Sequence, residues 1–473
     1  MDRVTTTVRR LTDFFGPVTL RATEAADADA GRAVFALPAT GGTVAVLQRI
    51  AAVVAVCVLP IFVAFGVVAD TGDTGLVSWP WQALTADLAV YVRAAEQLLA
   101  GQDIYDSAGG LPFLYPPVAA LLAVPLRLVE WSTAQMVWTA LNAVLVVAVL
   151  HRIGVERPWL LSLLSALVVQ LVHPVSLTLW YGQVGILLVA LVVLDLVPGP
   201  RLFPVRLLPA GALVGLAAAI KLTPLFFPVV LVCCRQWRTA LGAVGSFLLF
   251  GVVGAVAAPA ASRDYWWGLL GGDTGLGNSV LYVTNQSIHV AVLRRLGPDA
   301  SGAAVLASAL VVAVGALAVV AWWRRGAVGF AVCLGGVATL IASPVSWAHH
   351  FVWVVPMAVA LARPGIPDSL RALCGGWVLW LCLGFYNRLP GGGDVELTWT
   401  VDQWWVSAVS ALLGIAILAW AALLGWDDLR RGTPLPEPDQ GAGMSTTSTV
   451  SGPPGGQPET ASTSSAQDGK SAR

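Results

Sequence analysis

Asp87 is the first of three polar features that could carry chemistry in this largely apolar chain. It opens the stretch 87–101, in which apolar residues recur at helical spacing. The spacing predicts an amphipathic helix on a membrane surface, with Asp87 at its N-cap. A carboxylate at the lipid–water boundary is well placed to act as a general base, and the alternative is that it only caps the helix.

Lys221 is the second feature. It stands in the sequence Ile-Lys-Leu-Thr-Pro, at the end of an apolar run and with no carboxylate close to it in sequence. Ionisable groups within membrane segments are candidates for function. The alternative is a lysine whose head group only reaches to the interface. We interpret Lys221 as a ligand for phosphate.

The third feature is the adjacent pair His349 and His350, at the end of the stretch Ser-Pro-Val-Ser-Trp-Ala-His-His. A zinc site needs three or four converging ligands, and two adjacent residues cannot easily share one metal. The pair therefore indicates hydrogen bonds to phosphate or to a sugar hydroxyl. The segments 181–183 and 285–287 are weaker candidates, because each could be only a turn or a helix cap.

The composition indicates that lipid surrounds most of the chain. Hydrophobic residues make up 57% of the 473 residues and charged residues only 11%, whereas soluble chains carry about 25% charged residues. The formal net charge is zero and no phosphate-binding loop or dinucleotide fingerprint is present, so neither a nucleic-acid partner nor a nucleotide donor is indicated. The six cysteines lie in apolar runs without the spacing of a zinc site.

We expect an all-α polytopic integral membrane protein with about twelve spanning helices and both ends in the cytoplasm. Residues 1–45 form a cytoplasmic extension, 46–425 the membrane domain and 426–473 a disordered cytoplasmic tail, because the tail lacks the apolar residues that a core needs. The predicted spans are 46–69, 133–150, 158–178, 184–198, 207–221, 223–234, 239–258, 301–323, 326–342, 350–363, 370–386 and 403–425.

The distribution of arginines tests this topology. With the N-terminus inside, every inner connection is basic and the outer ones are mainly acidic, as the positive-inside rule requires. The apolar stretch 115–129 is short and contains three prolines, so we interpret it as an interfacial helix and not as a span. The first outer loop, 70–132, is then long and contains interfacial helices. Asp87, Lys221 and the histidine pair all fall on the outer face.

Several short stretches, in this order over residues 46–425, resemble the polyprenyl-phosphate-sugar-dependent glycosyltransferases of the GT-C class. The resemblance is strongest to the actinobacterial α-mannosyltransferase branch, which includes an enzyme of phosphatidylinositol-mannoside synthesis. The stretches are Asp87-Leu88-Ala89-Val90-Tyr91, Leu99-Ala100-Gly101, Ile104-Tyr105, Pro112-Phe113-Leu114-Tyr115-Pro116-Pro117, Gly182-Gln183-Val184, Lys221-Leu222-Thr223-Pro224, Asn285-Gln286-Ser287 and Ser343-Pro344-Val345-Ser346-Trp347-Ala348-His349-His350.

The resemblance implies a GT-C-type fold in the plasma membrane and an active site on its extracytoplasmic side. It implies transfer of mannose, with inversion, from polyprenyl-phosphate-mannose to a cell-envelope glycolipid or lipoglycan, forming an α-1,2 linkage. Asp87 would deprotonate the acceptor hydroxyl, and Lys221, His349 and His350 would hold the donor phosphate as it leaves. The residues that would line the substrate cavity are Tyr91, Tyr115, Gln183, Asn285, Gln286, Ser346 and Trp347.

Two positions depart from the resembled pattern. Ala348 stands where the family often has an acidic residue, and Ala86 stands where many relatives have a second carboxylate beside the base. The resemblance therefore implies a single-base mechanism with no metal and no cofactor.

Other functions stay open at this point. A pentosyltransferase of the same class, such as an arabinofuranosyltransferase, would share these features. A secondary transporter would instead place charges near the bilayer midplane and show repeated halves. A flippase or a non-catalytic scaffold would need no base at position 87.

Overall fold

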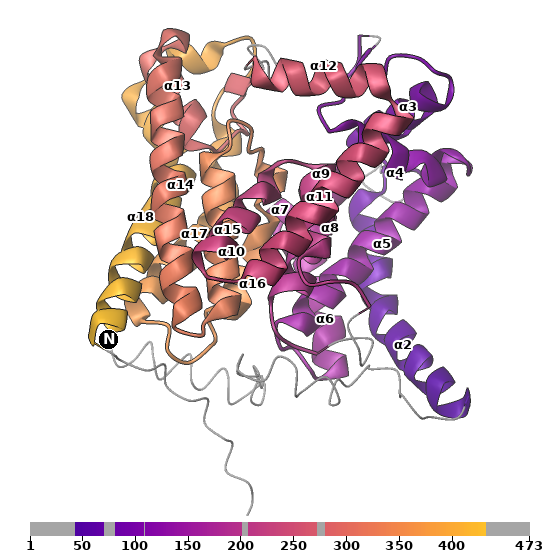
Figure 1. The fold of residues 1–473 in the computed structure, drawn as a ribbon, viewed down its shortest axis with the longest axis horizontal. Coiled ribbons are helices and arrows are strands. Elements are labelled where there is room, and N and C mark those ends of the chain that lie inside the picture. Colours follow the sequence, from indigo (N-terminus) through magenta and orange to yellow (C-terminus); the bar gives the residue numbers. More distant parts are fainter. Residues whose placement is uncertain (1–42, 71–80, 108, 201–206, 272–279, 432–473) are drawn as a thin grey trace, which may run out of the picture. The chain divides into compact units, whose positions relative to one another are not determined.

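The computed structural model describes residues 43–70, 81–107, 109–200, 207–271 and 280–431, which belong to one compact unit. The described residues form helices, and the only extended pairings among them are two isolated bridges, Ala69 with Ala83 and Asn285 with Trp347 (Figure 1). The predicted all-α class is confirmed. Most of the predicted N-terminal extension and of the predicted tail lies outside the described residues.

Six of the described helices are long and apolar enough to cross a membrane, and a pair bent by 76° could form a seventh span. The chain is therefore a multi-pass membrane protein, while the count of twelve spans stays a prediction. The six are α2 (Thr43–Val68), α5 (Trp131–Arg152), α11 (Trp237–Ala257), α14 (Ser301–Arg324), α17 (Asp368–Leu383) continued by η6 (Phe385–Arg388), and α18 (Val401–Arg431). The bent pair is α6 (Pro158–Leu171) with α7 (His173–Tyr181).

The other predicted spans are short helices, some of them interrupted. A single helix needs about twenty residues to cross the hydrocarbon layer, and none of these reaches that length. The interruptions fall at Lys221 and at the histidine pair, where the chain is extended or 3₁₀-helical. The elements are α8 (Gly185–Leu196), α9 (Ala212–Ile220), η2 (Thr223–Leu225), α10 (Phe226–Cys233), α15 (Val328–Ala342), η5 (Ala348–Trp353) and α16 (Val354–Ala360).

The segment predicted to be the first outer loop contains two helices where the sequence predicts them, α3 (Ala86–Leu99) and α4 (Pro117–Arg127). Their position at the membrane interface stays a prediction. The prediction that Asp87 is the N-cap is wrong. Thr85 is the N-cap, with its N–H bonded to the carbonyl of Trp180, so Asp87 is the second helical residue.

The segments after α11 complete the end of the molecule that carries α3. In Figure 1, α12 (Pro259–Leu270) lies across this end, and α13 also lies there. The remaining elements are α13 (Ile288–Leu296), η4 (Pro298–Ala300) and η7 (Val395–Thr398).

The last helix is longer than the sequence predicts. The predicted tail begins at 426, whereas α18 continues to Arg431, so that boundary is wrong. Asp428 accepts an ion pair from Arg325 at 2.8 Å, and Asp427 accepts one from Arg431 at 3.0 Å. These pairs stabilise the last helical turns, which the charge of the segment alone does not reveal.

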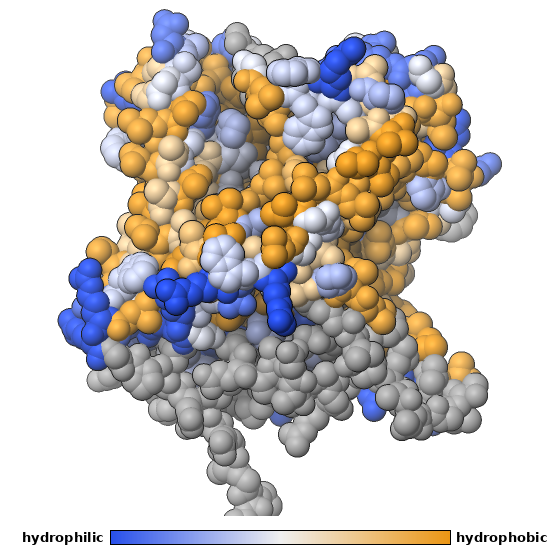
Figure 2. All heavy atoms as spheres, viewed as in Figure 1, coloured by the Kyte–Doolittle hydropathy of each residue, from blue (hydrophilic) through white to orange (hydrophobic). Residues whose placement is uncertain are grey.

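A wide apolar surface separates the two ends of the molecule. Figure 2 shows hydrophobic atoms over its middle and hydrophilic atoms gathered toward each end. On α11 the side chains of Leu241 and Val256 are 71% and 77% exposed. Such continuous apolar exposure is expected where the solvent is lipid.

Helix α9, which leads to Lys221, is held by a carboxylate at its start and by close packing against α11 in its middle. The buried Asp195 carboxylate accepts the N–H groups of Leu213 at 2.9 Å and Val214 at 3.1 Å, which satisfies donors at the start of α9. Farther along, a Cβ added at Gly215 would lie 2.2 Å from the carbonyl oxygen of Ala243 in α11. Only glycine permits this close packing of the two helices.

We predict that Gly215→Ala lowers the free energy of unfolding by about 1–3 kcal/mol, because the added methyl group overpacks the α9–α11 contact. Thermal unfolding in detergent measures the effect. Gly245→Ala is the matched control, since nothing lies within 4 Å of a Cβ at that position in α11. Equal melting temperatures for the two variants would contradict the close packing.

Candidate active site

Asp87 lies in the first turn of α3, at a point held by two other segments. The N-cap Thr85 has a φ of 31°, a left-handed conformation that is unfavourable for a β-branched residue. Gln135 of α5 donates to the Thr85 hydroxyl at 2.7 Å and to the Ala83 carbonyl at 2.8 Å. These bonds, with the one to Trp180, fix the start of α3 and thereby the place of Asp87.

Gln183 connects Asp87 with two tyrosines. Its Nε2 donates to Oδ2 of Asp87 at 2.8 Å, and its Oε1 accepts from the hydroxyls of Tyr91 at 2.8 Å and Tyr115 at 3.1 Å. The two hydroxyl oxygens lie 3.0 Å apart. Four residues that the sequence predicts for the site therefore form one hydrogen-bond network.

The surroundings change the proton affinity of these groups. Burial raises the pKa of Asp87, while the hydrogen bond from Gln183 and the charge of Lys221 lower it in part. Burial also raises the pKa of Tyr115 to about 12 and holds that of Tyr91 well above its ordinary value. Both phenols thus stay protonated donors at neutral pH, and Asp87 has the increased proton affinity that suits a base.

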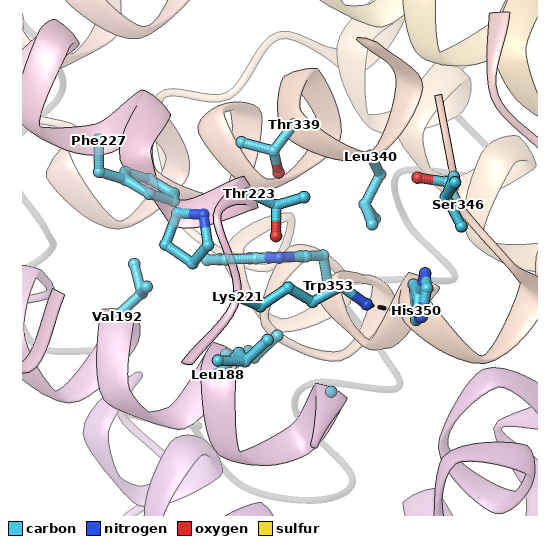
Figure 3. A pocket seen from close by; sticks show the side chains of 14 residues that line it. Leu188, Val192, Lys221, Thr223, Phe227, Thr339, Leu340, Ser346, His350 and Trp353 are labelled. Carbon is cyan, nitrogen blue, oxygen red and sulfur yellow. Dashed lines mark hydrogen bonds between the residues drawn. The ribbon is translucent and has the colours of Figure 1, made fainter. Parts of the chain in front are cut away.

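Lys221 follows α9 and turns toward His350. Its Nζ lies 3.0 Å from Nε2 of His350 (Figure 3) and 5.3 Å from the centroid of the Tyr115 ring. Tyr115 therefore belongs to both halves of the site, since its hydroxyl joins the Asp87 network and its ring faces the lysine ammonium.

The contact between Lys221 and His350 depends on which ring nitrogen carries the imidazole proton. Nδ1 of His350 lies 3.2 Å from the Trp347 N–H, and the ring also hydrogen-bonds the Val345 backbone. With the proton on Nδ1, Nε2 accepts from the lysine ammonium; with Nδ1 accepting from Trp347, the proton is on Nε2 and faces the ammonium. In the second case an anionic oxygen placed between them would accept from both, and phosphate supplies such an oxygen.

Two further polar atoms near this pair have no hydrogen-bond partner in the described part of the chain. Nε2 of His349 and Oγ of Ser346 are buried and make no hydrogen bond to any residue that the structure describes. Buried polar atoms are normally paired, so both are suited to a polar ligand. The His349 ring also lies against Tyr181, with 5.1 Å between ring centroids.

A cavity of about 40 Å³ lies next to Lys221 and His350. Figure 3 shows the lysine and histidine at one side of it and the flat ring of Trp353 within the lining. Its other lining residues are Gly185, Leu188, Val189, Val192, Thr223, Pro224, Phe227, Thr339, Leu340, Val345 and Ser346.

Asn285, a predicted substrate ligand, uses its polar atoms on the protein itself. Its Nδ2 donates to the carbonyls of Val280 and Pro344, each at 3.0 Å, and its Oδ1 accepts the Ser346 N–H at 3.0 Å. The side chain is fully buried. It joins the loop before α13 to the loop that carries the histidines, and its contact with substrate stays a prediction.

Gln286 and Trp347 also have protein partners. Gln286 accepts the Ser410 hydroxyl at 2.7 Å and donates to the Val283 carbonyl at 2.9 Å. The Trp347 ring makes an edge contact with Tyr282, with 6.5 Å between centroids. Like Asn285, these residues support the loop that carries His349 and His350, and their contact with substrate stays a prediction.

The sequence reasoning missed Gln135, the residue that holds the start of α3. It is 4% exposed and lies in the first turns of α5. The available signal was an amide in an apolar segment, where a polar side chain has to find an internal partner. Thr85 gave no such signal, because a left-handed threonine cannot be distinguished from an ordinary one in the sequence.

The two departures from the resembled pattern fall inside this site. Ala348 is buried in η5, and Ala86 opens α3 beside Asp87. Among the described residues, no three His, Cys, Asp or Glu side chains gather closely enough to hold a metal ion. The predicted metal-free, single-base mechanism stays a prediction.

Comparison with known proteins decides the class of the enzyme. Residues 113–344 match glycosyltransferase family 87. The chain is 32% identical over 401 residues to the polyprenol-phosphate-mannose-dependent alpha-(1-2)-phosphatidylinositol pentamannoside mannosyltransferase of Mycolicibacterium smegmatis, across 80% of the chain and 91% of the relative. The chain belongs to glycosyltransferase family 87. The predicted glycosyltransferase activity is confirmed.

A second relative has a similar name. The family-87 chain is 30% identical over 378 residues to the polyprenol-phosphate-mannose-dependent alpha-(1-2)-phosphatidylinositol mannoside mannosyltransferase of Mycobacterium tuberculosis, across 70% of the chain and 85% of the relative. The predicted resemblance to actinobacterial α-mannosyltransferases is thus confirmed. No solved structure gives a significant match.

The family match covers only part of the site. It includes Tyr115, Gln183, Lys221 and Asn285, and it lies between Asp87 and the histidine pair. Asp87, His349 and His350 lie outside the matched residues, so their assignment to the site depends on the contacts described above.

We predict that Asn285→Asp lowers the free energy of unfolding by about 2 kcal/mol, because two buried carbonyls lose their donors. Thermal unfolding in detergent and binding of the lipid-phosphate donor would be measured together. Asn387→Asp is the control, since its amide contacts His173 at an exposed site. Unchanged stability with weaker donor binding would instead make Asn285 a substrate ligand.

Proposed function

We propose that this family-87 enzyme transfers mannose from polyprenyl-phosphate-mannose to a hydroxyl of a glycolipid or lipoglycan. The observation that carries the proposal is the close placement of a half-buried carboxylate and a lysine–histidine pair, joined through Tyr115. The carboxylate is suited to removing a proton, and the lysine–histidine pair is suited to holding a phosphate. The two named relatives use a polyprenol-phosphate-mannose donor and form an alpha-(1-2) linkage, and we propose the same here.

The residues support a direct displacement. Asp87 removes the proton of the acceptor hydroxyl, and that oxygen forms a bond to the anomeric carbon. The bond from this carbon to the phosphate oxygen breaks, and the polyprenyl phosphate leaves with the electron pair. Attack opposite to the leaving group converts a β-linked donor into an α-linked product. Lys221 and His350 stabilise the charge that develops on the phosphate.

The proposed topology has twelve spans, both termini in the cytoplasm of the plasma membrane and the site on the extracytoplasmic face. Connections that we assign to the cytoplasmic side contact one another, which supports their common side. Arg152 donates to the Val197 carbonyl at 3.2 Å, and Arg325 pairs with Asp428. The polyprenyl chain would stay in the lipid, so the protein needs to recognise only the head group at the boundary.

We expect Asp87→Asn to lower kcat by at least about 100-fold, because general bases contribute about 10²–10⁴-fold. Transfer of labelled mannose from synthetic polyprenyl-phosphate-mannose, analysed by mass spectrometry of the product, measures it. Wild-type activity should fall as the pH decreases through the raised pKa of Asp87, because only the carboxylate can accept the proton. Donor binding should remain.

Asp299→Asn is the control, since that side chain is exposed in η4. Full activity of purified Asp87→Asn would contradict the assigned base. Transfer from a pentose donor and not from mannose would change the sugar assignment. Movement of lipid-linked sugar across liposomes without any transfer would favour a flippase.

We expect Lys221→Gln to weaken donor binding and to lower kcat by about 10²–10³-fold, because one cation that stabilises the leaving phosphate is lost. Steady-state kinetics with varied donor concentration separate the two effects. Arg263→Gln is the matched loss of a cation, since the Arg263 side chain is 67% exposed. An unchanged kcat and donor KM would show that Lys221 does not contact the phosphate.

A further inference from the structure

The orientation of the Gln183 amide is determined by its neighbours. Three donors converge on Oε1, the hydroxyls of Tyr91 and Tyr115 and the N–H of Val184 at 3.2 Å. An amide nitrogen cannot accept hydrogen bonds, so the reversed orientation would leave the Val184 N–H without its acceptor and would place Oε1 against the Asp87 carboxylate. Nε2 must therefore face Asp87.

This orientation makes the two oxygens of Asp87 unequal. Oδ2 accepts the amide N–H at 2.8 Å. Within the part of the chain that the structure describes, no residue hydrogen-bonds Oδ1. Oδ1 is thus the oxygen that can take a proton from an acceptor hydroxyl, while Oδ2 stays occupied.

The backbone around Gln183 is fixed independently of any substrate. Gly182 has a φ of 70°, and a Cβ there would lie 2.8 Å from Cβ of Leu88 in α3. The N–H of Gln183 donates to the Thr178 carbonyl at 2.9 Å. The turn therefore lies directly against the first turn of α3, so the distance between the amide and the carboxylate is set by packing.

We infer that Gln183 is a positioning residue for the base, and that Tyr91 and Tyr115 orient its amide. The inference rests on the proposed role of Asp87 and changes the expectation that Gln183 lines the substrate cavity. The side chain presents one N–H to Oδ2, leaves Oδ1 for the proton and stabilises the carboxylate before the acceptor arrives.

Removal of the Gln183 amide should change the pKa of Asp87 in a definite direction. The groups that influence or contact Asp87 are Lys221 after α9, Gln183 after α7, and three tyrosines: Tyr181 in α7, Tyr91 in α3 and Tyr115 before α4. Only the lysine and the amide favour the charged carboxylate. Removing the amide leaves burial opposed by the lysine alone, so the pKa of Asp87 increases and the acid limb of the activity profile moves to higher pH.

Gln183→Met tests the inference, because it keeps the length of the side chain and removes both hydrogen-bonding atoms. We expect kcat near neutral pH to fall about 10- to 100-fold, with the donor KM within about twofold. The acid limb should move up by about one pH unit, so the loss should shrink as the pH rises. Tyr115→Phe should shift the limb in the same direction by less.

Gln97→Met is the matched control in α3, since Gln97 donates to the Asp106 carbonyl and not to Asp87. It should keep the wild-type pH profile. If Gln183→Met does not fold, the same measurements are made on Tyr91→Phe and on Tyr115→Phe, because each of these changes removes only one hydroxyl that donates to Gln183.

Two results would overturn the inference. A higher donor or acceptor KM with an unchanged pH profile would make Gln183 a substrate ligand. A wild-type rate and profile would show that it has no role. Either result combined with an inactive Asp87→Asn would leave the base assignment intact, whereas an active Asp87→Asn would remove the base and the inference with it.

Discussion

The Gln183 amide hydrogen-bonds residues of two segments that are far from it in the sequence. It contacts Asp87 and Tyr91 in α3 and Tyr115 before α4, while its own backbone follows α7. In a low-dielectric interior each of these groups would be costly if left unpaired. The need to satisfy them together fixes how α3 and the segment before α4 pack against the turn after α7, and the Tyr115 ring extends this packing to Lys221.

The membrane limits where helices can be interrupted, and the candidate site residues Lys221, His349 and His350 lie at such interruptions. Irregular backbone at membrane depth is tolerated only where protein or a polar cavity surrounds it. Lys221 has an extended backbone between α9 and η2, and His349 and His350 lie in the 3₁₀ segment before α16. The freed backbone groups are paired within the protein, as in the bond from the Ala348 N–H to the Thr284 carbonyl. The interruptions thus bring polar side chains inward without exposing backbone to lipid.

The sequence predicted the helices more reliably than their ends. Apolar periodicity gave α3 and α4, because each buries one face against the bundle. The predicted cap at Asp87 was wrong, because Gln135 and Trp180 hold Thr85 at the start of α3. The last helix was predicted to end too early, because ion pairs stabilise the end of α18. Such contacts join residues from distant parts of the chain and leave no periodic signal.

By itself, the sequence determined the class of the protein and the residues that could react. Its apolar composition requires lipid, and the rarity of charge made Asp87, Lys221 and His350 conspicuous. The tertiary structure decided which of these groups meet and which support them. Lys221 contacts His350, Gln183 contacts Asp87, and Asn285 supports the histidine loop. The reason is physical: a side chain's type limits what it can do, whereas hydrogen-bond partners and burial, which only packing provides, decide what it does.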